Sequence, residues 1–217
     1  MEAEFMQTDK IKVTSTGTGA AKAMEEASKF AEYVGLDKKA VLRLRLLAEE
    51  TLGMVSAITE DFTAQFWIES TEDGVCKLHL SARTVMDYSK KKELIDASSD
   101  KKNAAAKGFM GKIRQIIENS LFSIDEVGSL QSEYGGMPLM YGEMGMSSAD
   151  GGTSLGAATY IWSLDKYRRS IESYGDTNSA AKEAWDELEK SIVANIADDV
   201  SVAVKGDMVD LVISKKF

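Results

Sequence analysis

Two stretches of alternating β-forming and polar residues, with the turn between them, constrain the fold more than any other part of the sequence. They span residues 62–69 and 75–82, and Asp73-Gly74 in the connection favours a tight hairpin turn. Side chains along a strand point alternately to its two faces, so the second stretch separates apolar from polar residues. Its apolar residues are Cys76, Leu78, Leu80 and Ala82, and its polar residues are Lys77, His79 and Ser81. The pattern predicts a β-hairpin in which Cys76 is buried.

The residues before this hairpin are expected to form a strand and two helices. Residues 11–14 alternate as a short strand, while 20–34 and 38–58 carry apolar residues at helical spacing. Gly35 fits the left-handed position that ends a helix, and Asp37 is a suitable N-cap for the next one. The second helix has a wide apolar stripe, which predicts that it packs in the core.

The second half of the chain combines a region of unusual composition with a second hairpin. From 128 to 157 Gly, Met, Ser and Tyr dominate, which predicts a long loop. Helices are expected at about 155–173 and 178–197, and a further hairpin at 200–204 and 208–213. Strands near both ends with helices between them favour a layered α/β (α+β) sandwich.

Composition argues against several classes of function. The net charge of −9 disfavours sequence-independent nucleic-acid binding, which needs a basic surface along the phosphates. One cysteine and one histidine provide neither a disulfide framework nor metal-ligand spacing. No apolar run approaches the roughly 20 residues that span a bilayer, and the first ten residues lack a signal-peptide core. We therefore expect a cytoplasmic protein with no membrane partner.

The order of these elements resembles that of the histidine-kinase-like ATPase superfamily, and most closely that of its anti-sigma factor serine kinases. The shared order is strand, helix, Gly-Leu, long helix, hairpin, and finally helix and hairpin, over about residues 10–83 and 188–215. The resemblance implies a two-layer sandwich of a mixed sheet and helices. It also implies a single ATPase-like domain over 1–217, with about 85–180 as a helical insertion that replaces or extends the lid.

In that family the long helix carries a glutamate that activates water or the substrate hydroxyl, and four residues later an asparagine that holds Mg²⁺. The best apolar register places Glu50 at the glutamate and Met54 at the asparagine, while a shift of one residue gives Glu49 and Gly53. Neither register supplies the metal ligand, so no metal-binding residue is assigned. The family's adenine-binding Asp-x-Gly-x-Gly turn is also missing after the hairpin, near Ala82 to Thr84.

Three segments compete for the family's Gly-rich lid. Two of them have glycines that open an apolar helix, where backbone N–H groups can bind phosphate, although a helix contact or a loop turn is the commoner reason for such glycines. The third, before the last hairpin, matches by connectivity but has no preceding glycines. The candidate cofactor-binding residues are Met54, Gly108, Gly111, Lys112, Gly151, Gly152 and Gly156.

Three further features have competing interpretations. The Met-rich segment within 128–157 is either an adaptable binding surface or part of the core. The basic stretch that begins at Lys90 is most simply a solvated helix face, and the alternative is a site for an acidic partner or phosphate. His79 is expected to be a strand residue with a satisfied hydrogen bond.

Two functions remain open from the sequence. The first is a regulatory or interaction protein on an anti-sigma-factor-like scaffold without efficient ATP turnover. The resemblance then implies a sigma factor or an anti-anti-sigma protein as partner, in bacterial signalling. The second is an ATP-binding protein or serine kinase of the anti-sigma type, with Mg-ATP as cofactor and Glu50, or Glu49 in the shifted register, as catalytic base. The missing asparagine and adenine-binding turn favour the first, and a homodimer stays open.

Overall fold

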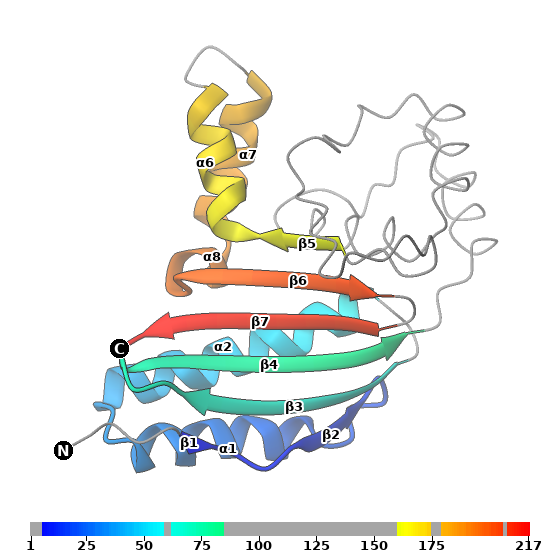
Figure 1. Ribbon diagram of the computed structural model, residues 1–217, viewed down its shortest axis with the longest axis vertical. Helices are drawn as coiled ribbons and strands as arrows, with labels where there is room; N and C mark the ends of the chain where they lie inside the picture. The colour runs from blue at the N-terminus through cyan, green and yellow to red at the C-terminus, as the bar shows by residue number, and fades with distance from the viewer. Residues whose placement is uncertain (1–5, 59–61, 85–159, 175–178, 206–207) are drawn as a thin grey trace, which may run out of the picture.

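A computed structural model of the chain describes residues 6–58, 62–84, 160–174, 179–205 and 208–217. In these residues seven strands form one sheet, and two long helices pack along it (Figure 1). The α+β class expected from the sequence is therefore confirmed. The elements are β1 (Met6–Gln7), β2 (Ile11–Thr14), α1 (Ala20–Tyr33), α2 (Lys38–Ile58), β3 (Phe62–Ser70), β4 (Val75–Thr84), β5 (Tyr160–Ser163), α6 (Leu164–Tyr174), α7 (Ser179–Lys190), α8 (Ile192–Ile196), β6 (Asp199–Lys205) and β7 (Met208–Lys216).

The strand order brings segments from the two halves of the chain together. Across the sheet the order is β1-β3-β4-β7-β6-β5, and β2 also pairs with β3. Both expected hairpins are present, as β3–β4 and β6–β7, and β7 joins them by pairing with β4. Every described pair is antiparallel, so the expectation of a mixed sheet is wrong. α1 and α2 connect β2 to its antiparallel neighbour β3, and α6, α7 and α8 connect β5 to its antiparallel neighbour β6.

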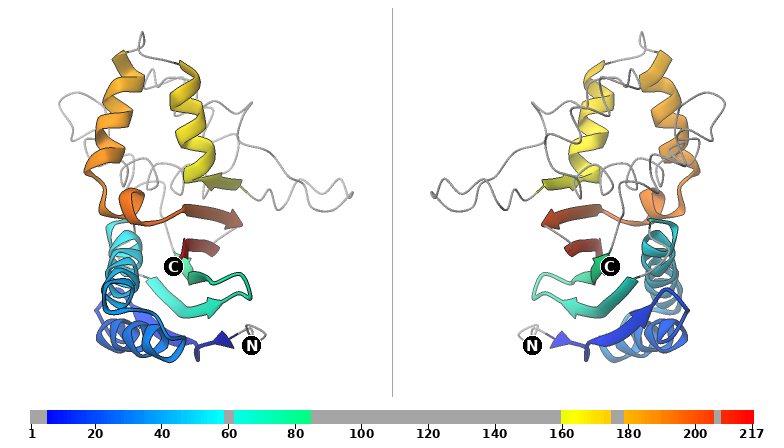
Figure 2. Two further views of the ribbon diagram at one scale, coloured as in Figure 1. Left: turned by 90° about the vertical axis from the view of Figure 1, so that its left-hand side faces the viewer. Right: turned by 90° about the vertical axis from the view of Figure 1, so that its right-hand side faces the viewer.

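One face of the sheet is buried because α1 and α2 cover it (Figure 2). α2 contributes four side chains with no exposed surface, Leu44, Leu47, Ala48 and Met54. Burying a large apolar side chain stabilises a fold by about 1.5 to 3 kcal/mol, so α2 is a major source of stability. Along β3, β4 and β7 every second residue points to this face and is buried, as the alternation predicted. These residues are Ala64, Phe66, Ile68, Cys76, Leu78, Leu80, Ala82, Val209, Leu211 and Ile213.

The turn between α1 and α2 follows the local signals in the sequence. Gly35 has a φ of 78° and its N–H donates to the Glu32 carbonyl, while the Leu36 N–H donates to the Ala31 carbonyl. These two bonds satisfy carbonyls that the end of α1 would otherwise leave unpaired. Asp37 then starts α2, because its carboxylate accepts a hydrogen bond of 2.8 Å from the Ala40 N–H. Both assignments made from the sequence are confirmed.

Two helices differ from the expectation. The helix expected over 155–173 starts only at Leu164, because residues 160–163 form the edge strand β5 and pair with β6. The helix expected over 178–197 is interrupted at Ser191, whose hydroxyl accepts a hydrogen bond from the Ala194 N–H and so starts α8. In both cases a pairing or capping interaction determines the boundary.

The part of the chain beyond β5 is only partly described. α6 and α7 pack as a pair beyond the β5 edge of the sheet (Figures 1 and 2). Most of the expected insertion over 85–180 lies outside the described residues, including the Met-rich segment and the basic stretch. Its described end, from residue 160 onward, forms β5, α6 and the start of α7.

Candidate functional site

The residues that the resemblance singled out lie in the middle of α2, on two different sides of the helix. Glu49 and Gly53 are exposed, Glu50 is half-buried, and Met54 is completely buried. Glu50 therefore lies at the border between the solvent-facing side of α2 and the core. A metal held beside Glu50 would require a neighbouring oxygen ligand, and position 54 offers a thioether that faces the core.

Among the described residues, the surroundings of Met54 offer no replacement ligand. Thr51, the neighbouring hydroxyl on α2, is itself buried and donates a hydrogen bond of 2.6 Å to the Leu47 carbonyl. Across the described residues no group of three or more His, Cys, Asp or Glu side chains is placed to hold a metal ion. Mg²⁺ binds oxygen ligands and prefers an octahedral set. The described part of α2 thus lacks the ligands for that chemistry.

The glycine-based candidates are not placed by the structure. Gly108, Gly111 and Lys112, as well as Gly151, Gly152 and Gly156, lie outside the described residues. Their role in binding a cofactor therefore stays a prediction.

The first half of α2 carries a group of exposed cations that the sequence argument did not single out. We define the α2 basic face as Lys38, Lys39, Leu42, Arg43 and Arg45, all of which are exposed. Leu42 is 67% exposed, an unusual fraction for a leucine in a long core helix. The signal was available in the sequence as a run of basic residues at helical spacing with no acidic residue before Glu49.

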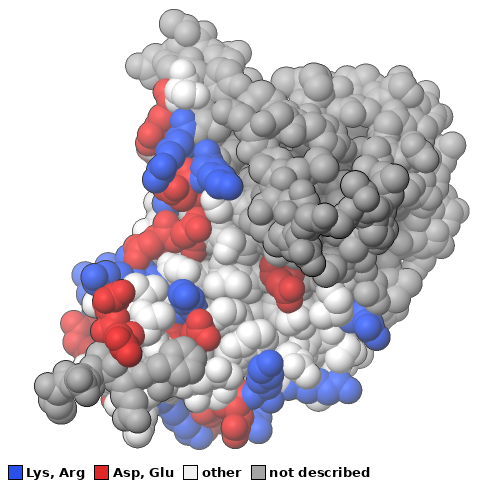
Figure 3. Space-filling model, viewed as in Figure 1, with Lys and Arg blue, Asp and Glu red and all other residues white. Residues whose placement is uncertain are grey.

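The opposite face of the sheet carries an ordered group of aromatic and charged side chains. The rings of Trp67 and His79 stack with centroids 4.7 Å apart, and the Lys10 ammonium lies 4.4 Å from the Trp67 ring centroid. Glu69 Oε1 lies 3.1 Å from His79 Nε2 and 3.7 Å from Lys77 Nζ. Figure 3 views this face, and its described part has charges of both signs with no extended region of one sign.

His79 differs from the expectation that its hydrogen bonds are satisfied. Its Nε2 atom is buried and has no hydrogen-bond partner among the described residues. The Glu69 carboxylate is within ion-pair distance, but it is not aligned for a hydrogen bond. Stacking on Trp67, directly opposite on β3, holds the imidazole instead.

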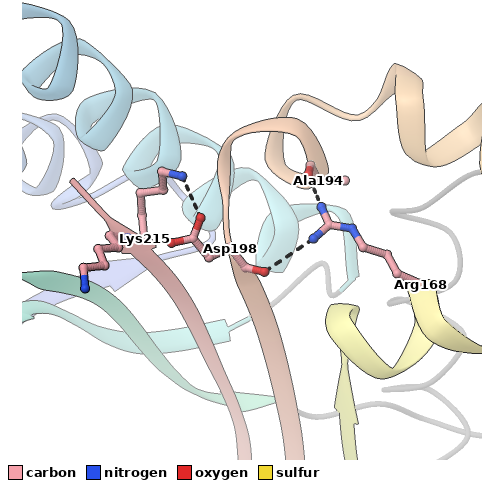
Figure 4. Close-up of polar contacts among 5 residues, drawn as sticks. Arg168, Ala194, Asp198 and Lys215 are labelled. Atoms are coloured by element: carbon pink, nitrogen blue, oxygen red, sulfur yellow. Dashed lines mark hydrogen bonds and ion pairs between the residues drawn. The ribbon is translucent and has the colours of Figure 1, made fainter.

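A third polar group joins α6, α8 and β7 around Asp198 (Figure 4). The Asp198 carboxylate accepts hydrogen bonds of 2.6 Å from Lys215 Nζ and from the Lys216 N–H. Arg168 donates to the backbone carbonyls of Asp198 and Ala194. Partial burial raises the pKa of Asp198, but the Lys215 and Lys216 hydrogen bonds and the nearby cations outweigh it and lower the pKa overall. Because each of these groups has a partner, this arrangement fixes the elements to one another.

Cys76 is the only thiol of the chain, and it is buried as expected. Burial raises its pKa to about 11, although a hydrogen bond with Ser70 acts in the opposite direction. The thiolate is therefore scarce at neutral pH, and the side chain behaves as a small apolar group.

No family model, curated protein or solved structure matches the chain. Among the described helices, none is both long and apolar enough to cross a membrane. The resemblance to the histidine-kinase-like ATPases thus rests on the order of elements alone.

Proposed function

We propose that the protein is a regulatory or interaction protein on an anti-sigma-factor-like ATPase scaffold, without efficient ATP turnover. The observation that carries this proposal is the complete burial of Met54, at the position where that family holds Mg²⁺ with an asparagine. A soft thioether in an apolar core neither ligates Mg²⁺ nor accepts a hydrogen bond from the metal's waters.

Catalysis of phosphoryl transfer depends almost entirely on positioning and on charge stabilisation by the metal. Glu50 retains access to solvent at the edge of the core, but a carboxylate without a metal-bound nucleotide has no substrate to activate. Loss of the metal ligand therefore removes the reaction while leaving the scaffold intact, because Met54 packs with the core instead of disrupting it.

The partner proposed from the resemblance is a sigma factor or an anti-anti-sigma protein in the bacterial cytoplasm. Binding to such a partner requires an accessible surface and no chemistry. The solvent-facing side of α2 and the face of the sheet that no described helix covers are the described surfaces that offer one.

Thermal unfolding with and without millimolar Mg-ATP tests the proposal. A ligand present at a hundredfold excess over its Kd stabilises the folded state by about 2.7 kcal/mol, which is a readily measured rise in Tm. We expect no rise and no release of phosphate.

A rise in Tm would instead support the alternative function, an ATP-binding protein or serine kinase of the anti-sigma type. The position of Glu50 at the border of the core is the observation that keeps this alternative. In that case Glu50→Ala, with retained ATP binding and lost turnover, would assign the catalytic base, and Glu49→Ala is the matched control for the other register.

A further inference from the structure

The α2 basic face places four cations around one exposed leucine in a chain whose net charge is −9. Lys38, Lys39 and Arg45 each lie three or four residues from Leu42, so they share its exposed side of the helix, and Arg43 lies beside them at the edge of that side. In Figure 2 α1 and α2 form the outer layer over the sheet, so this side of α2 points away from the rest of the fold. Tyr33, at the end of α1 just before the turn into α2, is 79% exposed and adds apolar surface nearby.

The four cations, Lys38, Lys39, Arg43 and Arg45, have no anionic partner among the described residues. The helix dipole disfavours cations in the first turn, where α2 has two lysines and no acidic residue.

Two other helices, α1 and α6, pair an exposed cation with an acidic residue. α1 pairs Lys29 with Glu25 at 2.6 Å, and α6 pairs Arg169 with Asp165 at 3.0 Å, each one helical turn apart. Asp165 also lies in the first turn of α6, where the dipole favours an anion. The N-terminal anion of α2 is the Asp37 cap, but the four cations of the α2 basic face have no such pairing among the described residues, which leaves their charge available to a partner.

We propose that the α2 basic face binds an acidic amphipathic helix of a partner protein. Carboxylates of the partner meet the four cations, and an apolar side chain at the centre of its contact covers Leu42. This inference rests on the proposed function, because it names the chemistry of the partner that an interaction protein would bind. Complementary charge at the rim and an apolar centre are the usual arrangement of a specific interface.

Two other classes of occupant fit less well. Sequence-independent nucleic-acid binding needs basic residues along an extended run of phosphates, whereas the α2 basic face has four cations on one helix. A helix that lies in a membrane surface buries a broad apolar face, whereas the broad apolar face of α2 is already in the core. An acidic protein segment satisfies both the charges and the leucine.

The direct test uses the full chain and a fluorescent 18-residue helical peptide with glutamates and leucines on one face. Its matched control has glutamine in place of every glutamate. We expect fluorescence anisotropy to show that the acidic peptide binds and that the glutamine peptide binds at least about tenfold more weakly. Added salt should weaken the binding of the acidic peptide. Equal binding of the two peptides, or no binding of the acidic one, would refute the proposal.

Two double variants with the same net charge locate the site. Lys39→Glu/Arg43→Glu reverses charge on the α2 basic face, and Lys22→Glu/Lys182→Glu reverses two exposed lysines on α1 and α7. We expect a loss of at least about tenfold in affinity for the acidic peptide from the first pair and less than about threefold from the second. Similar losses from both would mean that the peptide senses only the overall charge, and the α2 basic face would then not be its site.

The apolar part of the site is tested by Leu42→Ala, which we expect to weaken binding about tenfold without lowering Tm, because Leu42 is largely exposed. Anionic vesicles and duplex DNA are run beside the peptide. Suppose that the vesicles or the DNA bind the protein, that Lys39→Glu/Arg43→Glu abolishes this binding, and that the acidic peptide does not bind. The proposal of a protein helix as partner is then wrong. These readouts are independent of the Mg-ATP measurement, so failure here and failure of the proposed function are distinguishable.

Discussion

Replacing Met54 by asparagine restores the residue that the resemblance requires at the metal position, and we expect it to damage the fold without creating a metal site. Met54 has no exposed surface and lies among the apolar residues that α2 presents to the sheet. An asparagine there brings a carboxamide into the same space. Its oxygen is useful to Mg²⁺ only if a ligand reaches it, and the fold leaves no exposed path at this position.

The expected destabilisation follows from two contributions. Removing the buried methionine side chain loses about 1.5 to 3 kcal/mol of transfer free energy. Leaving the carboxamide without hydrogen-bond partners adds about 1 to 3 kcal/mol. Met54→Asn should therefore lower the free energy of unfolding by about 2.5 to 6 kcal/mol, a large part of the total stability of an ordinary domain.

Two matched variants isolate the cause. Met54→Leu keeps the volume and apolar character, so we expect it to lower stability by less than about 1.5 kcal/mol. Gly53→Asn places the same carboxamide one residue earlier, at an exposed position where a Cβ meets nothing within 4 Å. Because glycine is a poor helix former, Gly53→Asn should be neutral or slightly stabilising.

Urea unfolding followed by circular dichroism measures all three variants, each with and without Mg-ATP. If Met54→Asn is tolerated as well as Gly53→Asn, or gains Mg-dependent ATP binding, then position 54 faces a ligand and not the core. Either result would refute the burial argument on which the proposed function depends.

Three other predictions concern the scaffold. Gly17→Ala and Gly19→Ala both place a side chain at a φ of 84°, but only at Gly19 would the Cβ collide with the backbone of β2. Urea unfolding should therefore show that Gly17→Ala lowers the free energy of unfolding by about 1 kcal/mol and Gly19→Ala by at least about 3 kcal/mol. Equal losses from the two variants would contradict this. Asp198→Asn should lower stability by about 1 kcal/mol at neutral pH. Because the pKa of Asp198 is lowered by folding, this difference should vanish as the pH falls through that folded-state value, and a difference that persists in acid would exclude the carboxylate as its source. Cys76 should react with a thiol reagent only as fast as the protein unfolds, and rapid modification under native conditions would contradict its burial.

Much of the fold was predictable because its signals are local. The alternation in β3 and β4, the left-handed Gly35 and the cap at Asp37 each depend on residues that are close in sequence. β5 was not predicted, since a four-residue edge strand is defined by its pairing with β6 and not by its own pattern. Whether two strands pair parallel or antiparallel likewise depends on the path of the chain between them. The order of elements along the sequence does not determine that path.

The candidate site was predicted less completely. The apolar register already placed Met54 on the buried side of α2, and the structure agrees. The α2 basic face was missed because the sequence does not show which charged side chains form ion pairs. Its cations became notable only when the described residues showed no ion pair to them. The stacking of His79 on Trp67 depends on the hairpin register, which pairs these two residues directly across β3 and β4.

The position of β7 between β4 and β6 also has a consequence for synthesis of the chain. β4 is translated well before β7, since β5, α6, α7, α8 and β6 all come between them. Until β7 emerges from the ribosome, the β4 edge that it will cover presents unpaired backbone groups beside Leu78 and Leu80. Unpaired apolar edges of this kind recruit other strands, so the nascent first half is the stage most exposed to aggregation. Loss of β7, which leaves the β4 edge unpaired, should therefore promote aggregation more than loss of β5. Slow translation of the second half should promote it too, because the β4 edge then stays unpaired for longer.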